Sequence, residues 1–204
     1  SLLVLLAISF SALAALGQYG GGSGTAEDPY LIYRPGEMNT IGAMLLDYDK
    51  HFRLMADIDL SGYTGASFFI IGSSARPFTG VFDGNGHTIS NFTYTSTGTD
   101  YIGVFGHVDG PDAEIKDLGL INPSVDAGNG GRAGSLVGRI EEGSITSCYV
   151  EGGSVSGDSK VGGLVADNGG AITNCSSQGD SVIRLPAILR NLRRFIGYFP
   201  EVVF

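Results

Sequence analysis

The sequence lacks tryptophan, has only two cysteines in 204 residues, and is poor in charge, with Asp, Glu, Lys and Arg making up 16% of it. Two cysteines are too few for a disulfide scaffold, so a buried apolar core must hold the fold. The low charge, together with 33 glycines, argues against a helical protein and predicts many short strands joined by tight turns. The length suits one domain with a substantial core.

Basic residues are scarce outside the C-terminal tail. Residues 184–204 hold four arginines and one glutamate, a net charge of +3, so residues 1–183 carry −12 and the whole chain −9. Binding to a phosphate backbone needs clustered Lys and Arg that release counterions. The acidic body therefore argues against nucleic acid as a partner.

An apolar run, LLVLLAISFSALAAL, occupies residues 2–16 and is followed by small residues. Ala12-Leu13-Ala14 fits the A-x-A pattern of a signal-peptidase site, and cleavage after Ala14 or after Gly17 is compatible with it. The run is shorter than the roughly 20 apolar residues that a membrane-spanning helix needs. We interpret residues 1–17 as a signal peptide and residues 18–24 as a flexible Gly-rich spacer, and we expect a secreted or cell-surface protein.

The next segment, residues 25–77, is expected to form an N-terminal cap helix and the first strands. Residues 25–32 pass from polar turn residues into a short strand, and Pro35 can open a helix at its first position. Four apolar residues then recur on one helical face: Met38, Ile41, Met44 and Leu45. Residues 51–60 alternate with a period of two, which predicts a half-buried strand.

Two short patterns recur within residues 78–183. The first occurs as Gly80-Val81-Phe82, Gly103-Val104-Phe105, Ser135-Leu136-Val137 and Gly163-Leu164-Val165. The second is built on Ile89, Ile115, Ile145 and Ile172, spaced by 26, 30 and 27 residues. A unit of this length cannot close a core alone, but coils stacked about 4.8 Å apart pair every strand with its neighbours.

The repeats therefore predict an all-β fold, a parallel β-helix or solenoid. Right-handed coiling is favoured on general grounds for parallel crossovers. The unequal spacings predict loops of different length at the corners of the coil. Gly, Pro, Asp and Asn gather at residues 108–114 and 126–132, which are the expected places.

The repeat pattern stops abruptly in the tail, residues 184–204. Apolar residues there follow helical spacing, with arginines on the other side. Three interpretations stay open: a basic amphipathic helix that caps the end of the solenoid, the same helix in weak contact with a membrane surface, and a tail produced by a shift of the reading frame near Ser181.

Residues 160–176, KVGGLVADNGGAITNCS, closely resemble the GLUG motif, a repeat of bacterial exported proteins. Residues 134–149 form a second copy and residues 101–118 a more diverged third, and Ala166 stands where the motif usually has its second Gly. The resemblance covers about residues 24–182. It implies a β-helical, adhesin-like protein of the cell surface, often part of something larger, more distantly similar to pectate lyase-like β-helices, and without known catalytic residues. Some secreted metallopeptidases that cleave immunoglobulin A carry such repeats, but their H-E-x-x-H motif is absent from this sequence.

Asp57 and Asp59 are the best candidates for the carboxylate pair of a polysaccharide lyase or hydrolase, because they lie two residues apart with Arg53 nearby. We favour a simpler interpretation, in which they are the solvent-facing half of an amphipathic strand.

The stretch Asp83-Gly84-Asn85-Gly86-His87 has the side chains to hold a metal or to act as acid and base. Here we favour a turn in which both glycines take positive φ and Asp83 or Asn85 caps the chain.

Five other aspartates sit in Gly-rich corners, where carboxylates can bind Ca²⁺ weakly, although solvated turn residues are the simpler interpretation. They are Asp109, Asp112, Asp126, Asp158 and Asp167. Cys148 and Cys175 occupy equivalent repeat positions, and we expect an inward-facing ladder of thiols there, with a disulfide left open.

The sequence thus favours a non-catalytic, exported β-helix module that binds a glycan or protein partner at the surface. No residue is assigned a catalytic, cofactor-binding or metal-binding role, and no cofactor is expected. Two alternatives stay open: a polysaccharide lyase or glycoside hydrolase on the same scaffold, and a structural spacer that is a fragment of a larger surface protein.

Overall fold

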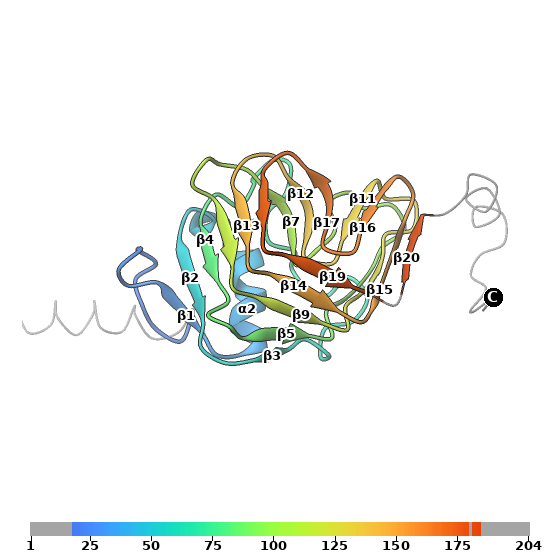
Figure 1. The fold of residues 1–204 in the computed structure, drawn as a ribbon. Helices are drawn as coiled ribbons and strands as arrows, with labels where there is room; N and C mark the ends of the chain where they lie inside the picture. The colour runs from blue at the N-terminus through green and yellow to red at the C-terminus, as the bar shows by residue number, and fades with distance from the viewer. Residues whose placement is uncertain (1–17, 180, 185–204) are drawn as a thin grey trace, which may run out of the picture.

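The structure is a computed structural model that describes residues 18–179 and 181–184. These residues form twenty short strands, an α-helix and one 3-10 turn (Figure 1). The strands pair in parallel within five sheets that run along the stack. The prediction of an all-β parallel β-helix is confirmed.

Each sheet collects one strand from successive coils. The six-stranded sheet holds β1 (Tyr30–Ile32), β2 (His51–Leu54), β4 (Val81–Asp83), β8 (Glu114–Lys116), β13 (Ser144–Thr146) and β18 (Ala171–Thr173). The five-stranded sheet holds β3 (Ile58–Asp59), β5 (Thr88–Ser90), β9 (Gly119–Ile121), β14 (Tyr149–Glu151) and β19 (Ser176–Gln178).

Three smaller sheets complete the coil. The four-stranded sheet holds β6 (Thr93–Thr95), β10 (Ser124–Asp126), β15 (Ser154–Gly157) and β20 (Ser181–Arg184). The two-stranded sheet holds β11 (Arg132–Gly134) and β16 (Lys160–Gly162). The three-stranded sheet holds β7 (Phe105–Val108), β12 (Val137–Ile140) and β17 (Val165–Asn168). Each coil can be counted from its strand in the six-stranded sheet, so four coils begin at β2, β4, β8 and β13. Strands β18 to β20 belong to the start of a further coil, and the stack therefore has about four turns.

The isoleucine pattern is right for the later coils and wrong for the first. Ile115 pairs with Ile145, and Ile145 pairs with Ile172, as expected for equivalent positions. Ile89, however, pairs with Leu120 in the five-stranded sheet. The spacing of 26 residues from Ile89 to Ile115 therefore compares positions in two different sheets. The error arises because an inward isoleucine occurs on more than one sheet of the coil.

The Gly-Val-Phe pattern has the same error. Phe105, Val137 and Val165 are paired in the three-stranded sheet, which confirms the later copies. Phe82 lies instead in β4 and pairs with Ile115, whereas the residue bridged to Phe105 in the preceding coil is Ile71. An apolar triplet of this kind fits any inward-facing strand and does not identify its sheet.

The expected helix is present as α2 (Pro35–Ala43) and begins at Pro35. Met38 and Ile41 are buried in the core, and α2 lies at the β1 and β2 end of the stack (Figure 1). Met44 and Leu45, expected on the same face, are 41% and 49% exposed. The helix ends before them, and the chain continues as the 3-10 turn η1 (Leu45–Asp47).

The expected strand over residues 51–60 is split by a corner into β2 and β3. Its inward alternation is largely confirmed, because four of the five apolar residues are buried, namely Phe52, Leu54, Ile58 and Leu60. Ala56 lies at the corner and is half-buried. The predicted loops at residues 108–114 and 126–132 are confirmed as the connections from β7 to β8 and from β10 to β11.

The chain packs against the first coil already at Tyr19, which is 9% exposed. The Gly20 N–H donates to the Leu31 carbonyl over 2.8 Å, so residues 18–24 differ from the flexible spacer that was expected.

The signal-peptide interpretation of residues 1–17 and the helix expected in the tail lie outside the described residues, apart from Arg184 at the end of β20. Within residues 18–179 and 181–184, no helix has the length and apolar character to cross a bilayer.

Two columns of left-handed residues form corners of the coil. The corner between the six- and five-stranded sheets stacks residues with φ of 50–54°: Asn85, Asp117, Ser147 and Asn174. The next corner stacks Asn91, Asn122 and Gly152 at φ of 57°, 49° and 69°. Hydrogen bonds join successive members through their neighbours, as from the Ser147 N–H to the Thr173 carbonyl over 3.0 Å. The left-handed conformation suits Asn, Asp and Gly better than other residues.

Large aromatic side chains fill the first coils. The rings of Phe52 and Phe105 lie 6.2 and 5.3 Å from that of Phe78, and Phe82 lies 5.2 Å from Phe105. Smaller side chains such as Val, Ile and Cys fill the later coils. The last coil is more open, because Ile172 is 40% exposed while its paired neighbour Ile145 is fully buried.

Replacing Ser147 with valine is expected to lower the free energy of unfolding by about 1–2 kcal/mol, because a β-branched residue disfavours left-handed backbone. Ser147 is exposed, so the buried area hardly changes. Thr146→Val, one residue earlier in β13 and outside the left-handed region, is the matched control and should change stability by less than about 0.5 kcal/mol. Urea unfolding measures both variants, and equal midpoints would contradict the strained corner.

Candidate functional site

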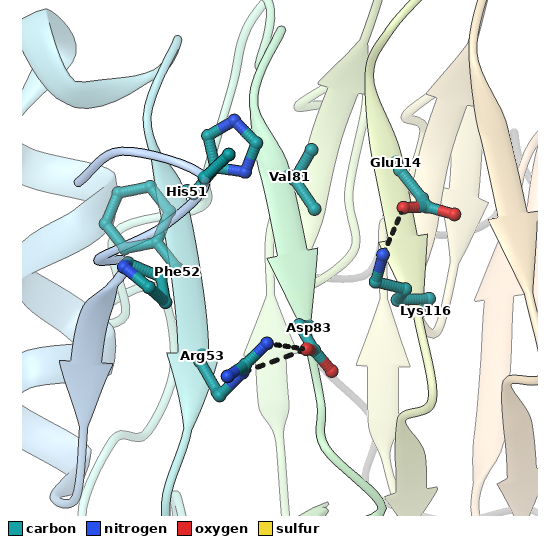
Figure 2. Close-up of a pocket in the computed structure, with 9 residues that line it drawn as sticks. His51, Phe52, Arg53, Val81, Asp83, Glu114 and Lys116 are labelled. Carbon is teal, nitrogen blue, oxygen red and sulfur yellow. Dashed lines mark hydrogen bonds and ion pairs between the residues drawn. The ribbon is translucent and has the colours of Figure 1, made fainter.

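The outer face of the six-stranded sheet carries side chains in straight rows. One row places His51, Val81 and Glu114 in successive coils, and the other places Arg53, Asp83 and Lys116. These rows, with Phe52 and the turn residues Ala26 and Pro29, line a shallow groove of about 230 Å³. Figure 2 shows the charged side chains lying across neighbouring strands of this face. We call it the outer groove.

The charges in the outer groove are paired. Arg53 Nε and Nη2 each lie 3.0 Å from Asp83 Oδ2, and Lys116 Nζ donates to Glu114 Oε2 over 2.6 Å (Figure 2). The hydrogen bond to Glu114 raises the pKa of Lys116, so this ammonium stays charged. The groove thus offers several hydrogen-bond donors and acceptors with little net charge, on a rigid backbone.

The two candidate catalytic aspartates hold the backbone in place. Asp57 accepts a hydrogen bond from the Thr88 N–H over 2.8 Å and lies 3.3 Å from His87 Nδ1. Asp59 accepts from Asn91 Nδ2 and from the Ser61 N–H, each over 2.9 Å. The hydrogen bond from the Thr88 backbone lowers the pKa of Asp57, and that from the Asn91 side chain lowers the pKa of Asp59. A general acid needs the opposite shift.

The stretch from Asp83 to His87 is a turn, as expected. Asp83 Oδ1 accepts the Asn85 N–H over 2.8 Å, and Asn85 Nδ2 reaches the Leu54 carbonyl over 3.2 Å. The residues with positive φ are Asn85 and Gly86, not Gly84 as expected. Gly84 is needed for another reason, since a Cβ there would collide with the carbonyl oxygen of Asp117 in the next coil.

The five corner aspartates do not come together. Asp126 accepts from the Gly128 N–H and from Ser156 Oγ, each over 3.0 Å. Asp112 is exposed in the loop before β8, and Asp158 lies between β15 and β16. The remaining two lie at the three-stranded sheet.

Asp167 joins two cations that are stacked in register. Arg132 pairs with Lys160 in the two-stranded sheet. Asp167 Oδ2 lies 2.8 Å from Arg132 Nε, and Asp167 Oδ1 lies 2.6 Å from Lys160 Nζ. Hydrogen bonds from Lys160 and Arg132 lower the pKa of Asp167. An ion bridge fixed in this way leaves little room for a Ca²⁺ ligand.

Asp109 lies beside His107 and Glu141, two residues that sequence reasoning missed. Ligand atoms of these three side chains lie within 4.8 Å of one another. A histidine and a glutamate 34 residues apart give no local motif. The signal is visible only when the coils are aligned, because Val108 pairs with Ile140 and so places Asp109 next to Glu141.

The expected ladder of thiols is confirmed. Cys148 is 1% exposed, and its N–H donates to Cys175 Sγ over 3.4 Å. Both thiols are free. Burial raises the pKa of Cys148 to about 12, so its nucleophilic thiolate form is disfavoured at neutral pH.

No family model matches the chain. It is 36% identical over 165 residues, 76% of the chain, to halomucin of Haloquadratum walsbyi, and spans 2% of that protein. It is 36% identical over 105 residues, 50% of the chain, to a "Putative Gly-rich membrane protein" of Evansella cellulosilytica, and spans 12% of it. A solved structure described as a "putative immunoglobulin A1 protease" from Bacteroides ovatus matches with a TM-score of 0.62 and 25% identity, over 80% of this chain and 51% of that one. The chain thus corresponds to a small part of both curated relatives.

Replacing Asp167 with asparagine is expected to lower the free energy of unfolding by about 1 kcal/mol at neutral pH, because Arg132 and Lys160 then repel across the ladder. The ion pairs lower the pKa of Asp167 below its ordinary value of 3.8, so the stabilisation is present above that pH and is lost as pH falls through the lowered pKa. Asp112→Asn in an exposed loop is the control. Urea midpoints compared between neutral and acidic pH test this; a difference that persists in acid would contradict it.

Proposed function

We propose that this chain is a non-catalytic β-helix module of a surface protein, exported and adhesin-like, and that its outer groove binds a glycan. The observation that carries the proposal is the pair of straight rows on the six-stranded sheet, which present five polar side chains and Val81 at the repeat of the coil. The chain of a polysaccharide is itself a repeat, so a rigid row of donors and acceptors suits it.

The charges of the groove favour a neutral glycan. Arg53 and Asp83 compensate each other, as do Lys116 and Glu114. The whole chain carries −9, so an anionic polysaccharide is repelled at low salt. Paired charges still hydrogen-bond hydroxyl groups, because each carboxylate and each cation keeps unused donor or acceptor positions.

The alternative of a lyase or hydrolase finds less support. Asp57 and Asp59 hold turns and have lowered pKa values, which suits neither an acid nor a proton shuttle. The solved structure is described as a putative protease, but that description applies to the other protein. This sequence has no H-E-x-x-H motif. A surface role agrees with the names of the two curated relatives, a halomucin and a Gly-rich membrane protein, and with the resemblance to GLUG repeats.

Purified protein is expected to be retained on immobilised neutral polysaccharides, such as cellulose, xylan or mannan, and not on pectin or alginate at low salt. The double variant Arg53→Gln and Lys116→Gln should weaken retention about tenfold or more, because each charge-assisted hydrogen bond contributes about 1.5–3 kcal/mol. Affinity electrophoresis or a glycan array measures this.

The matched control carries Lys50→Gln and Arg76→Gln, which removes the same two charges outside the groove lining. Unchanged retention of the groove variant, relative to this control, would contradict a glycan site in the groove. Release of reducing or unsaturated ends that disappears in Asp57→Ala or Asp59→Ala would favour the enzyme instead. Absence of retention on every glycan tested would favour the spacer or a protein partner.

A further inference from the structure

A second polar cluster lies on the three-stranded sheet and is not used by the outer groove. It consists of His107 in β7, Asp109 just after that strand, and Glu141 just after β12. Their burial differs, since His107 is buried, Asp109 is half-buried and Glu141 is exposed. The cluster therefore reaches from a buried imidazole to an exposed carboxylate.

The register of the coils builds this cluster. His107 pairs with Arg139, and Val108 pairs with Ile140. The Glu141 N–H then donates to the Val108 carbonyl over 2.9 Å. This hydrogen bond places Glu141, which belongs to the next coil, beside Asp109. Two carboxylates are thus stacked in adjacent coils, an arrangement that is destabilising without a cation between them.

His107 has unused nitrogens inside this cluster. The residue is 6% exposed, and neither Nδ1 nor Nε2 has a hydrogen-bond partner among the described residues. Nε2 lies 3.3 Å from Glu141 Oε2, but without the alignment of a hydrogen bond. The Tyr101 ring stacks on the imidazole at 5.4 Å and 20°, which fixes the plane of the ring. Buried polar atoms are rarely left unpaired, so both imidazole nitrogens are available to a ligand.

We propose that His107, Asp109 and Glu141 bind one divalent transition-metal ion of the Zn²⁺ type, which links two adjacent coils. An imidazole nitrogen with two carboxylate oxygens is a donor set that Zn²⁺ accepts, with water at the fourth position. Bonds of about 2.0–2.2 Å place tetrahedral ligand atoms about 3.4 Å apart. The ligand atoms lie within 4.8 Å of one another, so binding requires rotation of the Asp109 and Glu141 side chains to reach that separation. Ca²⁺ is disfavoured, since it takes about six to eight oxygen ligands.

Arg139 completes the surroundings of the ion. Its Nη2 lies 3.0 Å from Glu141 Oε1, which leaves Oε2, the oxygen nearer to His107, for the metal. Such a contact orients a ligating carboxylate. With Arg139 counted, the two carboxylates leave a local charge of about −1 for a divalent cation to neutralise.

A cluster shared by the two- and three-stranded sheets shows the same arrangement with the signs reversed. Arg132 and Lys160 are like charges stacked in register, and Asp167 joins them by ion pairs. Asp109 and Glu141 are like charges stacked in adjacent coils, and the group that joins them in the same way must be positive.

The test is titration of the metal-free, EDTA-treated chain with Zn²⁺ alone, followed by calorimetry and by thermal unfolding. Wild-type protein is expected to bind one ion and to unfold at a higher temperature with Zn²⁺ present, because the ion binds the folded chain. Asp109→Asn and Glu141→Gln should each weaken binding about tenfold or more and remove the thermal shift. Glu142→Gln, the adjacent exposed carboxylate, is the matched control and should behave as wild type.

Two further measurements separate this site from other zinc-binding groups. Long-range ¹H–¹⁵N spectra of the imidazoles should show Zn²⁺ shifting His107 and not His51 or His87, with His107→Gln used for assignment if it folds. The complex with Co²⁺ in place of Zn²⁺ should show no thiolate-to-cobalt absorption. The presence of that absorption would mean that Cys148 and Cys175 bind the ion. The proposal is overturned if wild type binds no ion at millimolar Zn²⁺, if Asp109→Asn and Glu141→Gln bind as tightly as Glu142→Gln, or if thiolate absorption appears.

Discussion

Every coil of this protein has to turn where the coil before it turns, because its strands gain their hydrogen bonds only from the coils on either side. The columns of left-handed residues meet this requirement. Asn85, Asp117, Ser147 and Asn174 adopt nearly the same φ although the residues differ, so the conformation of the corner is kept while its side chain varies. Loops of different length are tolerated elsewhere, as between β7 and β8, because the strand after the loop returns to the register of the stack.

This constraint determines what kind of site the protein can form. Equivalent positions in successive coils lie next to each other, as Arg53 and Asp83 do. The outer groove draws Arg53, Asp83 and Lys116 from three strands of one sheet, each in a different coil. Neighbouring side chains on such a face form a row, so a ligand that spans several coils would contact one side chain from each coil.

Sequence alone was sufficient for the fold because period, turn chemistry and inward apolar residues all agree in the later coils. It was insufficient for the first coil, where Ile89 and Phe82 satisfied the patterns of sheets to which they do not belong. Within a coil every sheet needs the same inward apolar residue, so a short motif fixes the presence of a strand but not its place. His107 was missed for a related reason, since its partner Glu141 comes from the next coil and becomes visible only with the register.

Charge follows the same rule of stacking. Many aspartates in this acidic chain accept hydrogen bonds at the corners. Asp59 accepts from Asn91 and Ser61, and Asp126 accepts from the Gly128 N–H. The number of aspartates therefore says little about catalysis. Where charges stack between coils, opposite signs alternate in the row from Arg53 through Asp83 to Lys116. Like charges occur where a third group joins them, as Asp167 does for Arg132 and Lys160. Carboxylates stacked in adjacent coils are therefore better evidence for a cation than the same carboxylates scattered over a surface, because the fold holds them together against their repulsion.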